Sequence, residues 1–163
     1  MSFTRRHLPH WIPDNATVFV TWRLAGSLPL HATDDTSRKP SGPVWLQDPR
    51  VAGAIRNALL YGETVRGFYQ LLAWVVMPNH VHAIFLPHAA MPVIMRWLKG
   101  RTSRVANRIL GRTGTPFWQD ESFDHWIRSA EELQHLIEYV ENNPLKAGLV
   151  QTKEQWQWSS AAR

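Results

Sequence analysis

The pattern of hydrophobic and polar residues predicts four β-strands along the chain. Residues 17–23 alternate between two sides and carry β-branched or aromatic side chains at most positions, as expected for a strand. Residues 68–77 and 80–86 are two apolar runs separated by a Pro-Asn pair, which predicts an antiparallel hairpin. Residues 116–127, rich in aromatic side chains, favour a fourth extended segment.

Hydrophobic residues at helical spacing predict three helices between and after these strands. The first covers residues 51–60, and the second covers residues 91–110 with an irregularity expected at Gly100. The third begins at Ser129, which opens a capping box. Because proline lacks a backbone N–H, we expect Pro144 to end this helix.

The order of these elements is β-α-β-β-α-β followed by one more helix. This order predicts an α+β fold of the ferredoxin-like, split βαβ type, with an antiparallel sheet and a C-terminal helix. The 163 residues suit a single domain that covers residues 1–163. Clustered turn-forming residues predict a flexible loop within it, over residues 31–50.

Composition and charge narrow the classes of function. Hydrophobic residues make up 44% and charged residues 19% of the chain, which is typical of a globular protein. The absence of cysteine excludes disulfides, zinc–cysteine sites and thiol nucleophiles. A net charge of +5 favours a polyanionic partner, although a basic protein without such a partner would show the same balance. No apolar run is long enough to span a bilayer, and we expect a cytoplasmic, nucleoid-associated protein without a membrane partner.

His80 and His82 are the first candidate functional group. Residues two apart on a strand point to the same face, so the two imidazoles lie side by side while Val81 faces the other way. Two adjacent imidazoles are costly to protonate together, and a divalent cation between them is one natural arrangement. Two hydrogen-bonded structural histidines are the alternative, and the pair alone does not choose between them.

Tyr139 is the second candidate, on the flank of the apolar face of the last helix. Asn143 follows four residues later, near the same line along the helix. An ordinary boundary tyrosine would have the same position, so only its combination with the histidines is informative. A phenol attacks a phosphodiester poorly near neutral pH, and a divalent ion on a phosphate oxygen makes the phosphorus more electrophilic. A histidine pair on a strand with a tyrosine on a helix across it therefore suits covalent cleavage of a nucleic-acid strand.

Several longer motifs make the chain resemble the REP-associated tyrosine transposases, which belong to the single-tyrosine HUH transposase superfamily. The two most specific motifs are VVMPNHVH at residues 75–82 and YVENNPLKAGLV at residues 139–150. Further matching segments are RHLPH at residues 6–10, TWRLAGSLP at 21–29, PFWQDESFDHW at 116–126 and WQWSS at 156–160.

The resemblance implies a mechanism and a substrate. His80 and His82 would be ligands of Mg²⁺ or Mn²⁺, and Asn143 would match a polar third ligand. Tyr139 would be the catalytic nucleophile, forming a 5′-phosphotyrosine link and releasing a 3′-hydroxyl. The partner would be single-stranded DNA folded into hairpins, the repetitive extragenic palindromes, and no obligate protein partner is implied.

Basic residues predict where the DNA would be contacted. The run from residue 96 to residue 112 carries six Arg or Lys and no acidic residue, and several recur at helical spacing. A solvated basic helix face is the alternative interpretation. The resemblance adds an N-terminal DNA-contacting segment, residues 1–16. The predicted DNA-binding residues are Arg5, Arg6, His7, Lys99, Arg101, Arg104, Arg108 and Arg112.

Three functional interpretations follow. The first is a metal-dependent enzyme that cuts and rejoins single-stranded DNA. The second is a hairpin-binding module of the same fold that does not cut, and it predicts metal-independent binding and no effect of Tyr139→Phe. The third is a small metal hydrolase on a different substrate, which predicts a water nucleophile and no covalent adduct. The presence of His80, His82 and Tyr139 in one chain favours the first interpretation.

Overall fold

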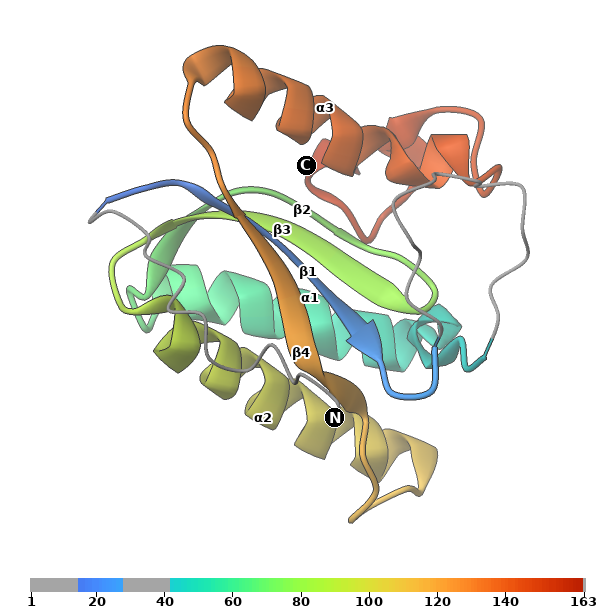
Figure 1. Ribbon diagram of the computed structural model, residues 1–163. Coiled ribbons are helices and arrows are strands. Elements are labelled where there is room, and N and C mark those ends of the chain that lie inside the picture. Colours follow the sequence, from blue (N-terminus) through green and yellow to red (C-terminus); the bar gives the residue numbers. More distant parts are fainter. Residues whose placement is uncertain (1–14, 28–41, 163) are drawn as a thin grey trace, which may run out of the picture.

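The fold is built on a four-stranded antiparallel sheet. A computed structural model describes residues 15–27 and 42–162 (Figure 1). The strands are β1 (Val18–Leu24), β2 (Tyr69–Val76), β3 (His80–Pro87) and β4 (Trp118–Trp126), in the order β2-β3-β1-β4. All three strand pairs are antiparallel. This order and the intervening helices confirm the predicted ferredoxin-like α+β fold.

Helices cover both faces of the sheet. α1 (Pro49–Thr64) and α2 (Met91–Leu110) lie together on one face, and α3 (Ala130–Lys146) crosses the other face (Figure 1). Three short 3₁₀ turns complete the described elements: η1 (Trp45–Gln47), η2 (Lys153–Gln155) and η3 (Ser160–Ala162). The sheet therefore lies between two helical layers of different size, α1 with α2 on one face and α3 on the other.

Local sequence signals set the helix ends. The Asp48 side chain accepts a hydrogen bond from the backbone N–H of Arg50 at 2.9 Å, so it caps α1, in which proline takes the first position. Gly111 ends α2 in the left-handed conformation with φ 67°, where a residue with a Cβ would be strained. The Ser129 hydroxyl accepts from the backbone N–H of Glu132 at 3.0 Å and caps α3 as predicted, but the Glu132 carboxylate accepts from the backbone N–H of Arg128 at 2.7 Å, so the second half of the predicted capping box is not formed.

Two predicted helix irregularities are wrong. α2 runs without a break through Gly100, because Leu98 and Thr102 on either side are buried and packing holds this stretch in place. α3 continues through Pro144 to Lys146. A proline this close to the C-terminal end removes only one helical hydrogen bond, and Pro144 is itself buried.

The predicted loop at residues 31–50 is only partly described. Residues 31–41 lie outside the described residues. The remainder contains η1 and the first two residues of α1, which starts at Pro49, slightly earlier than the pattern of apolar residues predicted. The predicted N-terminal segment, residues 1–16, also lies outside the described residues except for its last two positions.

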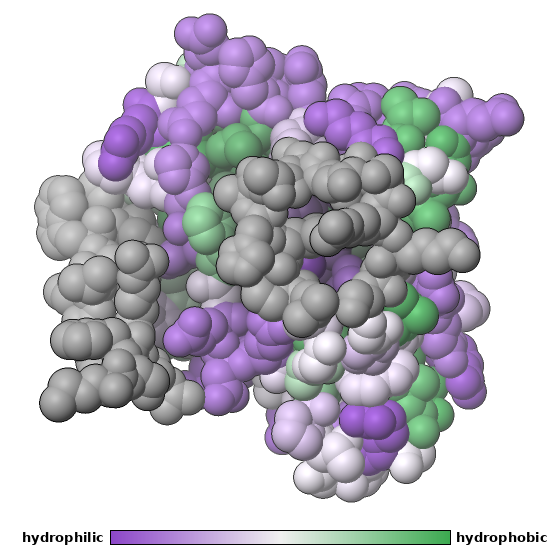
Figure 2. Space-filling model, turned by 45° about the vertical axis from the view of Figure 1, so that its right-hand side comes forward, coloured by the Kyte–Doolittle hydropathy of each residue, from purple (hydrophilic) through white to green (hydrophobic). Residues whose placement is uncertain are grey.

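Two hydrophobic cores correspond to the two layers. The larger core joins one face of the sheet to α1 and α2 and contains large buried side chains such as Trp22, Trp74 and Phe85. The smaller core joins the other face to α3 around Phe19, Ile84 and other buried residues. Outside them, the face shown in Figure 2 carries hydrophobic residues in separate small patches among hydrophilic ones. None of the described helices is long and apolar enough to cross a membrane.

The C-terminal segment covers one edge of the sheet. Ser159 forms a bridge with Val75 of β2, and the Trp156 indole N–H donates to the Val76 carbonyl at 3.0 Å. The Ser160 hydroxyl donates to the Glu141 carboxylate of α3 at 2.9 Å. This segment therefore protects the β2 edge, whereas no described strand pairs with the outer side of β4.

Candidate active site

The histidine pair lies on β3, on the face of the sheet covered by α3. The neighbouring residues Val81 and Ala83 point into the larger core, so His80 and His82 point toward α3. Their Nε2 atoms lie 3.1 Å apart. His80 is 6% exposed and His82 is 4% exposed. The predicted side-by-side arrangement is therefore present.

The second nitrogen of each imidazole is held by a neighbour. His82 Nδ1 lies 2.6 Å from the Thr21 hydroxyl, across the register that pairs Thr21 with His82. His80 Nδ1 lies 2.7 Å from the Asn79 side-chain oxygen. One assignment of protons satisfies every contact: Thr21 donates to His82, His82 donates to His80, and His80 donates to Asn79. In a metal site both outer nitrogens would donate, so His82 would carry its proton on Nδ1 and donate it to the Thr21 hydroxyl.

The surroundings keep both imidazoles neutral. Burial, followed by the positive charge of Arg23, lowers the pKa of His82 to about 3. Burial, followed by the charges of His82 and Arg23, lowers the pKa of His80 well below its ordinary value. Two neutral imidazoles need no net loss of a proton to bind a cation, but His82 would have to move its proton from Nε2 to Nδ1 so that both Nε2 lone pairs face the cation.

Tyr139 packs directly against the pair. Its ring centroid is 5.5 Å from that of His82 and 6.1 Å from that of Phe19, in edge-to-face geometry. The Lys146 ammonium lies 5.5 Å from the centre of the Tyr139 ring. Tyr139 is half-buried, as the helical pattern predicted. β3 and α3 thus bring together two groups that are 57 residues apart in the sequence (139 − 82).

The histidine pair fits a divalent cation. Two neutral imidazoles with adjacent Nε2 atoms and anchored outer nitrogens are suitable donors. Asn143 lies in α3 four residues after Tyr139, so both side chains emerge on a similar side of that helix. Among the described residues, no group of three or more His, Cys, Asp or Glu side chains could hold a metal. The role of Asn143 as a third ligand stays a prediction.

Apart from Lys99, the predicted DNA-binding residues fall into three groups: exposed residues on α2, residues packed against aromatic rings, and residues outside the described ranges. Arg104 and Arg108 are exposed on α2. Arg101 is also exposed, with its guanidinium carbon 4.8 Å from the centre of the Tyr61 ring. The guanidinium carbon of Arg112 lies 3.9 Å from the centre of the Trp45 ring. Arg5, Arg6 and His7 lie outside the described residues.

Lys99 has a structural partner. Its ammonium donates to the backbone carbonyls of Gln119, Asp120 and Glu121 at 2.9, 3.2 and 3.4 Å. Burial lowers the pKa of Lys99, while the carboxylates of Asp120 and Glu121 act in the opposite direction. Lys99 therefore ties α2 to β4, a role that the charge pattern alone did not indicate.

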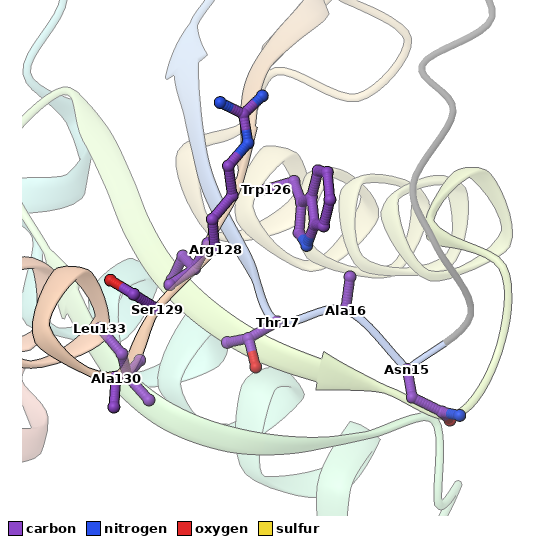
Figure 3. A pocket seen from close by; sticks show the side chains of 9 residues that line it. Asn15, Ala16, Thr17, Trp126, Arg128, Ser129, Ala130 and Leu133 are labelled. Carbon is purple, nitrogen blue, oxygen red and sulfur yellow. The ribbon is translucent and has the colours of Figure 1, made fainter.

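A hollow of about 460 Å³ lies near the start of β1, whereas the histidine pair lies opposite Thr21 and Arg23 near the end of that strand. It forms where β4 passes into α3, close to the start of β1, and Trp126, Arg128 and Ser129 are among its lining residues (Figure 3). The Arg128 guanidinium carbon is 5.2 Å from the centre of the Trp126 ring. None of the predicted catalytic or metal-binding residues lines this hollow.

The site also contains residues that the sequence analysis did not single out. Phe19 stacks on His82 with a centroid distance of 5.5 Å, and Thr21 and Asn79 bind the outer imidazole nitrogens. Asn79 could have been found from its place directly before His80. Phe19 and Thr21 could be found only from the register between β1 and β3, because the two strands are more than 50 residues apart.

Comparisons with known proteins agree with the fold and identify the family. Residues 61–143, about half of the chain, match the family described as "Transposase IS200 like", and this match includes His80, His82, Tyr139 and Asn143. The chain is 29% identical over 111 residues to a REP-associated tyrosine transposase of Escherichia coli (strain K12). That alignment covers 67% of this chain, and the chain spans 64% of the length of that relative.

A solved structure shares the fold. It is the structure of a REP-associated tyrosine transposase bound to a REP hairpin, with a TM-score of 0.62 and 22% sequence identity. The match covers 94% of this chain and 81% of that chain. The resemblance seen in the sequence motifs is thus confirmed by family, relative and fold together. This chain belongs to the IS200-like transposase family.

Proposed function

We propose that the protein is a metal-dependent single-stranded DNA endonuclease and strand transferase. The observation that carries the proposal is the packing of Tyr139 against the neutral His80–His82 pair, with ring centroids of Tyr139 and His82 5.5 Å apart. The name of the solved relative, which is bound to a REP hairpin, supports palindromic hairpin DNA as the substrate. Mg²⁺ or Mn²⁺ is the proposed cofactor, because these ions bind phosphate oxygens as well as protein ligands.

The proposed reaction is the attack of a tyrosine on a phosphodiester. A bond forms between the Tyr139 hydroxyl oxygen and phosphorus, and the bond between phosphorus and the 3′ oxygen breaks. The phenol releases its proton to solvent, and the departing 3′ oxygen takes up a proton to become a hydroxyl. Strand joining is the reverse attack by a 3′-hydroxyl on the phosphotyrosine. A bound divalent ion would be held by His80 and His82 and would supply charge stabilisation at the phosphate.

The side chains of the site have separate tasks in this reaction. Thr21 and Asn79 fix the rotation of the two imidazoles through their outer nitrogens. Phe19 packs against both His82 and Tyr139 and so limits where the phenol ring can lie. Near-complete burial of the pair excludes water, which strengthens electrostatic interactions at the phosphate.

A hairpin-binding module that does not cut is the second candidate function. The observation that favours it is the contact between the two Nε2 atoms, 3.1 Å apart, which satisfies the buried pair without any cation. Such a module would bind hairpins equally well in the presence of chelator, and the hydroxyl of Tyr139 would have no chemical role.

Denaturing gel electrophoresis distinguishes the two functions. A hairpin oligonucleotide from the repeats beside the gene is labelled at its 3′ end, because the tyrosine stays on the 5′ phosphate of the downstream fragment. We expect a covalent protein–DNA band with Mg²⁺ or Mn²⁺ for the wild type and for Tyr61→Phe, a control on the exposed Tyr61 of α1. Tyr139→Phe and chelator should each abolish the band.

The other outcomes contradict the proposal in different ways. Hairpin binding without a covalent band would favour the binding module. A band that survives in Tyr139→Phe would place the nucleophile elsewhere. Absence of hairpin binding would contradict both candidate functions and leave only family membership.

A further inference from the structure

Arg23 is a half-buried cation within the candidate site. It pairs with His80 across the register between β1 and β3, as Thr21 pairs with His82. Its neighbours Trp22 and Leu24 belong to the larger core, so Arg23 points to the face that carries the histidines. Its charge lowers the pKa of both histidines, which places it close to the pair.

One buried N–H group of the Arg23 guanidinium, that of Nη1, lacks a hydrogen-bond partner among the described residues. No ion pair of Arg23 occurs within residues 15–27 and 42–162. Burial lowers the pKa of Arg23, and a negatively charged Tyr139 would raise it. A buried donor without a partner is unfavourable, so a residue that carries one is a candidate for a functional role.

We propose that Arg23 is a catalytic residue that binds a non-bridging oxygen of the reacting phosphate through its unpartnered guanidinium N–H. A phosphate is the anion that would complete the site, because a guanidinium presents forked donors that match phosphate oxygens. The phosphate has two non-bridging oxygens, so one can bind Arg23 while the other remains accessible to a cation at the histidines. This inference rests on the proposed function.

Arg23 would act at two stages of the reaction. Before attack, it holds the phosphate beside Tyr139, whose interaction with the guanidinium becomes favourable as the phenol loses its proton. During attack, negative charge grows on the non-bridging oxygens, and a donor already in place stabilises that charge without reorganisation. Sequence analysis placed Arg23 only within a motif, because its position opposite His80 depends on strand register.

Single-turnover cleavage of the 3′-labelled hairpin tests this role. We expect Arg23→Ala to slow formation of the covalent band by about 100- to 1000-fold, as for loss of one preorganised oxyanion donor. Hairpin affinity should change by less than about tenfold, because one phosphate contact among several is lost. Guanidinium ions added at millimolar concentration should restore part of the rate in Arg23→Ala and none in Tyr139→Phe. Arg56→Met, on the exposed face of α1, is the matched control and should cleave normally.

Thermal unfolding of Arg23→Met separates a catalytic role from a structural one. If the role of the guanidinium is to bind a phosphate, replacing it with an apolar side chain of similar length should leave the Tm of the DNA-free protein unchanged or raise it. A structural arginine would lower the Tm. The variant also allows cleavage to be measured if Arg23→Ala does not fold.

Two results would overturn the assignment. Cleavage at the wild-type rate by Arg23→Met would show that no essential phosphate contact comes from Arg23. A lower Tm of Arg23→Met, together with no guanidinium rescue of Arg23→Ala, would show a structural role. Either result would leave the Tyr139-dependent band of the wild type intact, whereas loss of that band would contradict the proposed function itself.

Discussion

The two faces of the sheet differ in what they bury. The face under α1 and α2 holds the larger core, with Trp22, Trp74 and Phe85 packed between sheet and helices. The face under α3 holds a smaller core that also buries polar groups, the histidine pair and Thr21, with the half-buried Arg23 beside them. Burying polar groups reduces stability unless they are paired, so the larger core allows the other face to carry chemistry.

The faces also differ in where charge lies. The exposed arginines of α2 lie across the sheet from the histidines, on the opposite layer (Figure 1). DNA that contacts both the histidine pair and these arginines would have to extend around the sheet. The β4 edge is one such place, because no described strand covers it. The basic helix and the reacting phosphate would thus bind different parts of the same DNA.

Lowering the pH should reduce the free energy of unfolding through the buried histidines on the α3 face, and this is the largest effect we expect. The pKa of His82 is about 3 in the folded protein, below its ordinary value of 6.5. Between these two values the unfolded chain binds more protons, so stability is present above pH 6.5 and is lost as the pH falls toward 3. A slope of about 1.4 kcal/mol per pH unit gives a loss of about 2–3 kcal/mol from pH 6.5 to pH 4.5.

Urea unfolding in chelator at several pH values measures this loss. His82→Gln cannot take up the proton, so its unfolding free energy should fall less steeply with decreasing pH than that of the wild type. Parallel profiles for the two proteins would show that His82 is not held neutral by the fold.

One chemical change made on each face should affect cleavage differently. Thr21→Val removes the partner of His82 Nδ1, and we expect metal affinity or cleavage per folded molecule to fall by about 10- to 100-fold, with a loss of stability of about 1–3 kcal/mol because a buried nitrogen is left without a partner. Thr102→Val, on the buried side of α2, leaves the Trp118 indole N–H without its acceptor and should lower stability by a similar amount while leaving the site intact.

Cleavage rates per folded molecule and urea midpoints distinguish these two variants. Thr102→Val should cleave at the wild-type rate once the folded fraction is taken into account. Equal losses of cleavage in both variants would mean that the two faces are not functionally separate.

Salt dependence of hairpin binding tests the role of α2, with the smallest expected effect. Arg104→Gln should reduce the slope of log affinity against log salt by about 0.7–0.9 if the arginine contacts one phosphate. Lys99→Met should leave the slope unchanged, because its ammonium already binds three carbonyls of β4. A change in slope for Lys99→Met but not for Arg104→Gln would reverse this assignment.

The sequence predicted the elements of the fold well because their signals are local. The bounds of α2 match the predicted residues 91–110, and the spacing of His80 and His82 correctly placed both on one face. The local signal at Pro144 wrongly predicted the end of α3. The helix continues because the Pro144 side chain is buried and only one helical hydrogen bond is lost there.

The rest of the site depends on contacts between distant strands. The order of elements predicts which strands are neighbours but not their register, so Thr21 and Arg23 could not be assigned to His82 and His80 beforehand. Charge counts likewise could not separate Lys99, which faces β4 carbonyls, from the exposed Arg104 on the same helix. These roles follow from the contacts that each side chain makes in the folded protein, which residue type alone does not predict.

Mass spectrometry of the protein–DNA adduct tests the proposed site most directly. The chain has three tyrosines, of which Tyr61 and Tyr69 lie on the α1 side and Tyr139 lies on α3. After digestion of the adduct with nuclease and protease, we predict a nucleotide 5′-phosphate on the Tyr139 peptide alone. A nucleotide on Tyr61 or Tyr69, or cut DNA with a free 5′-phosphate and no modified peptide, would contradict the assignment of Tyr139 as the nucleophile.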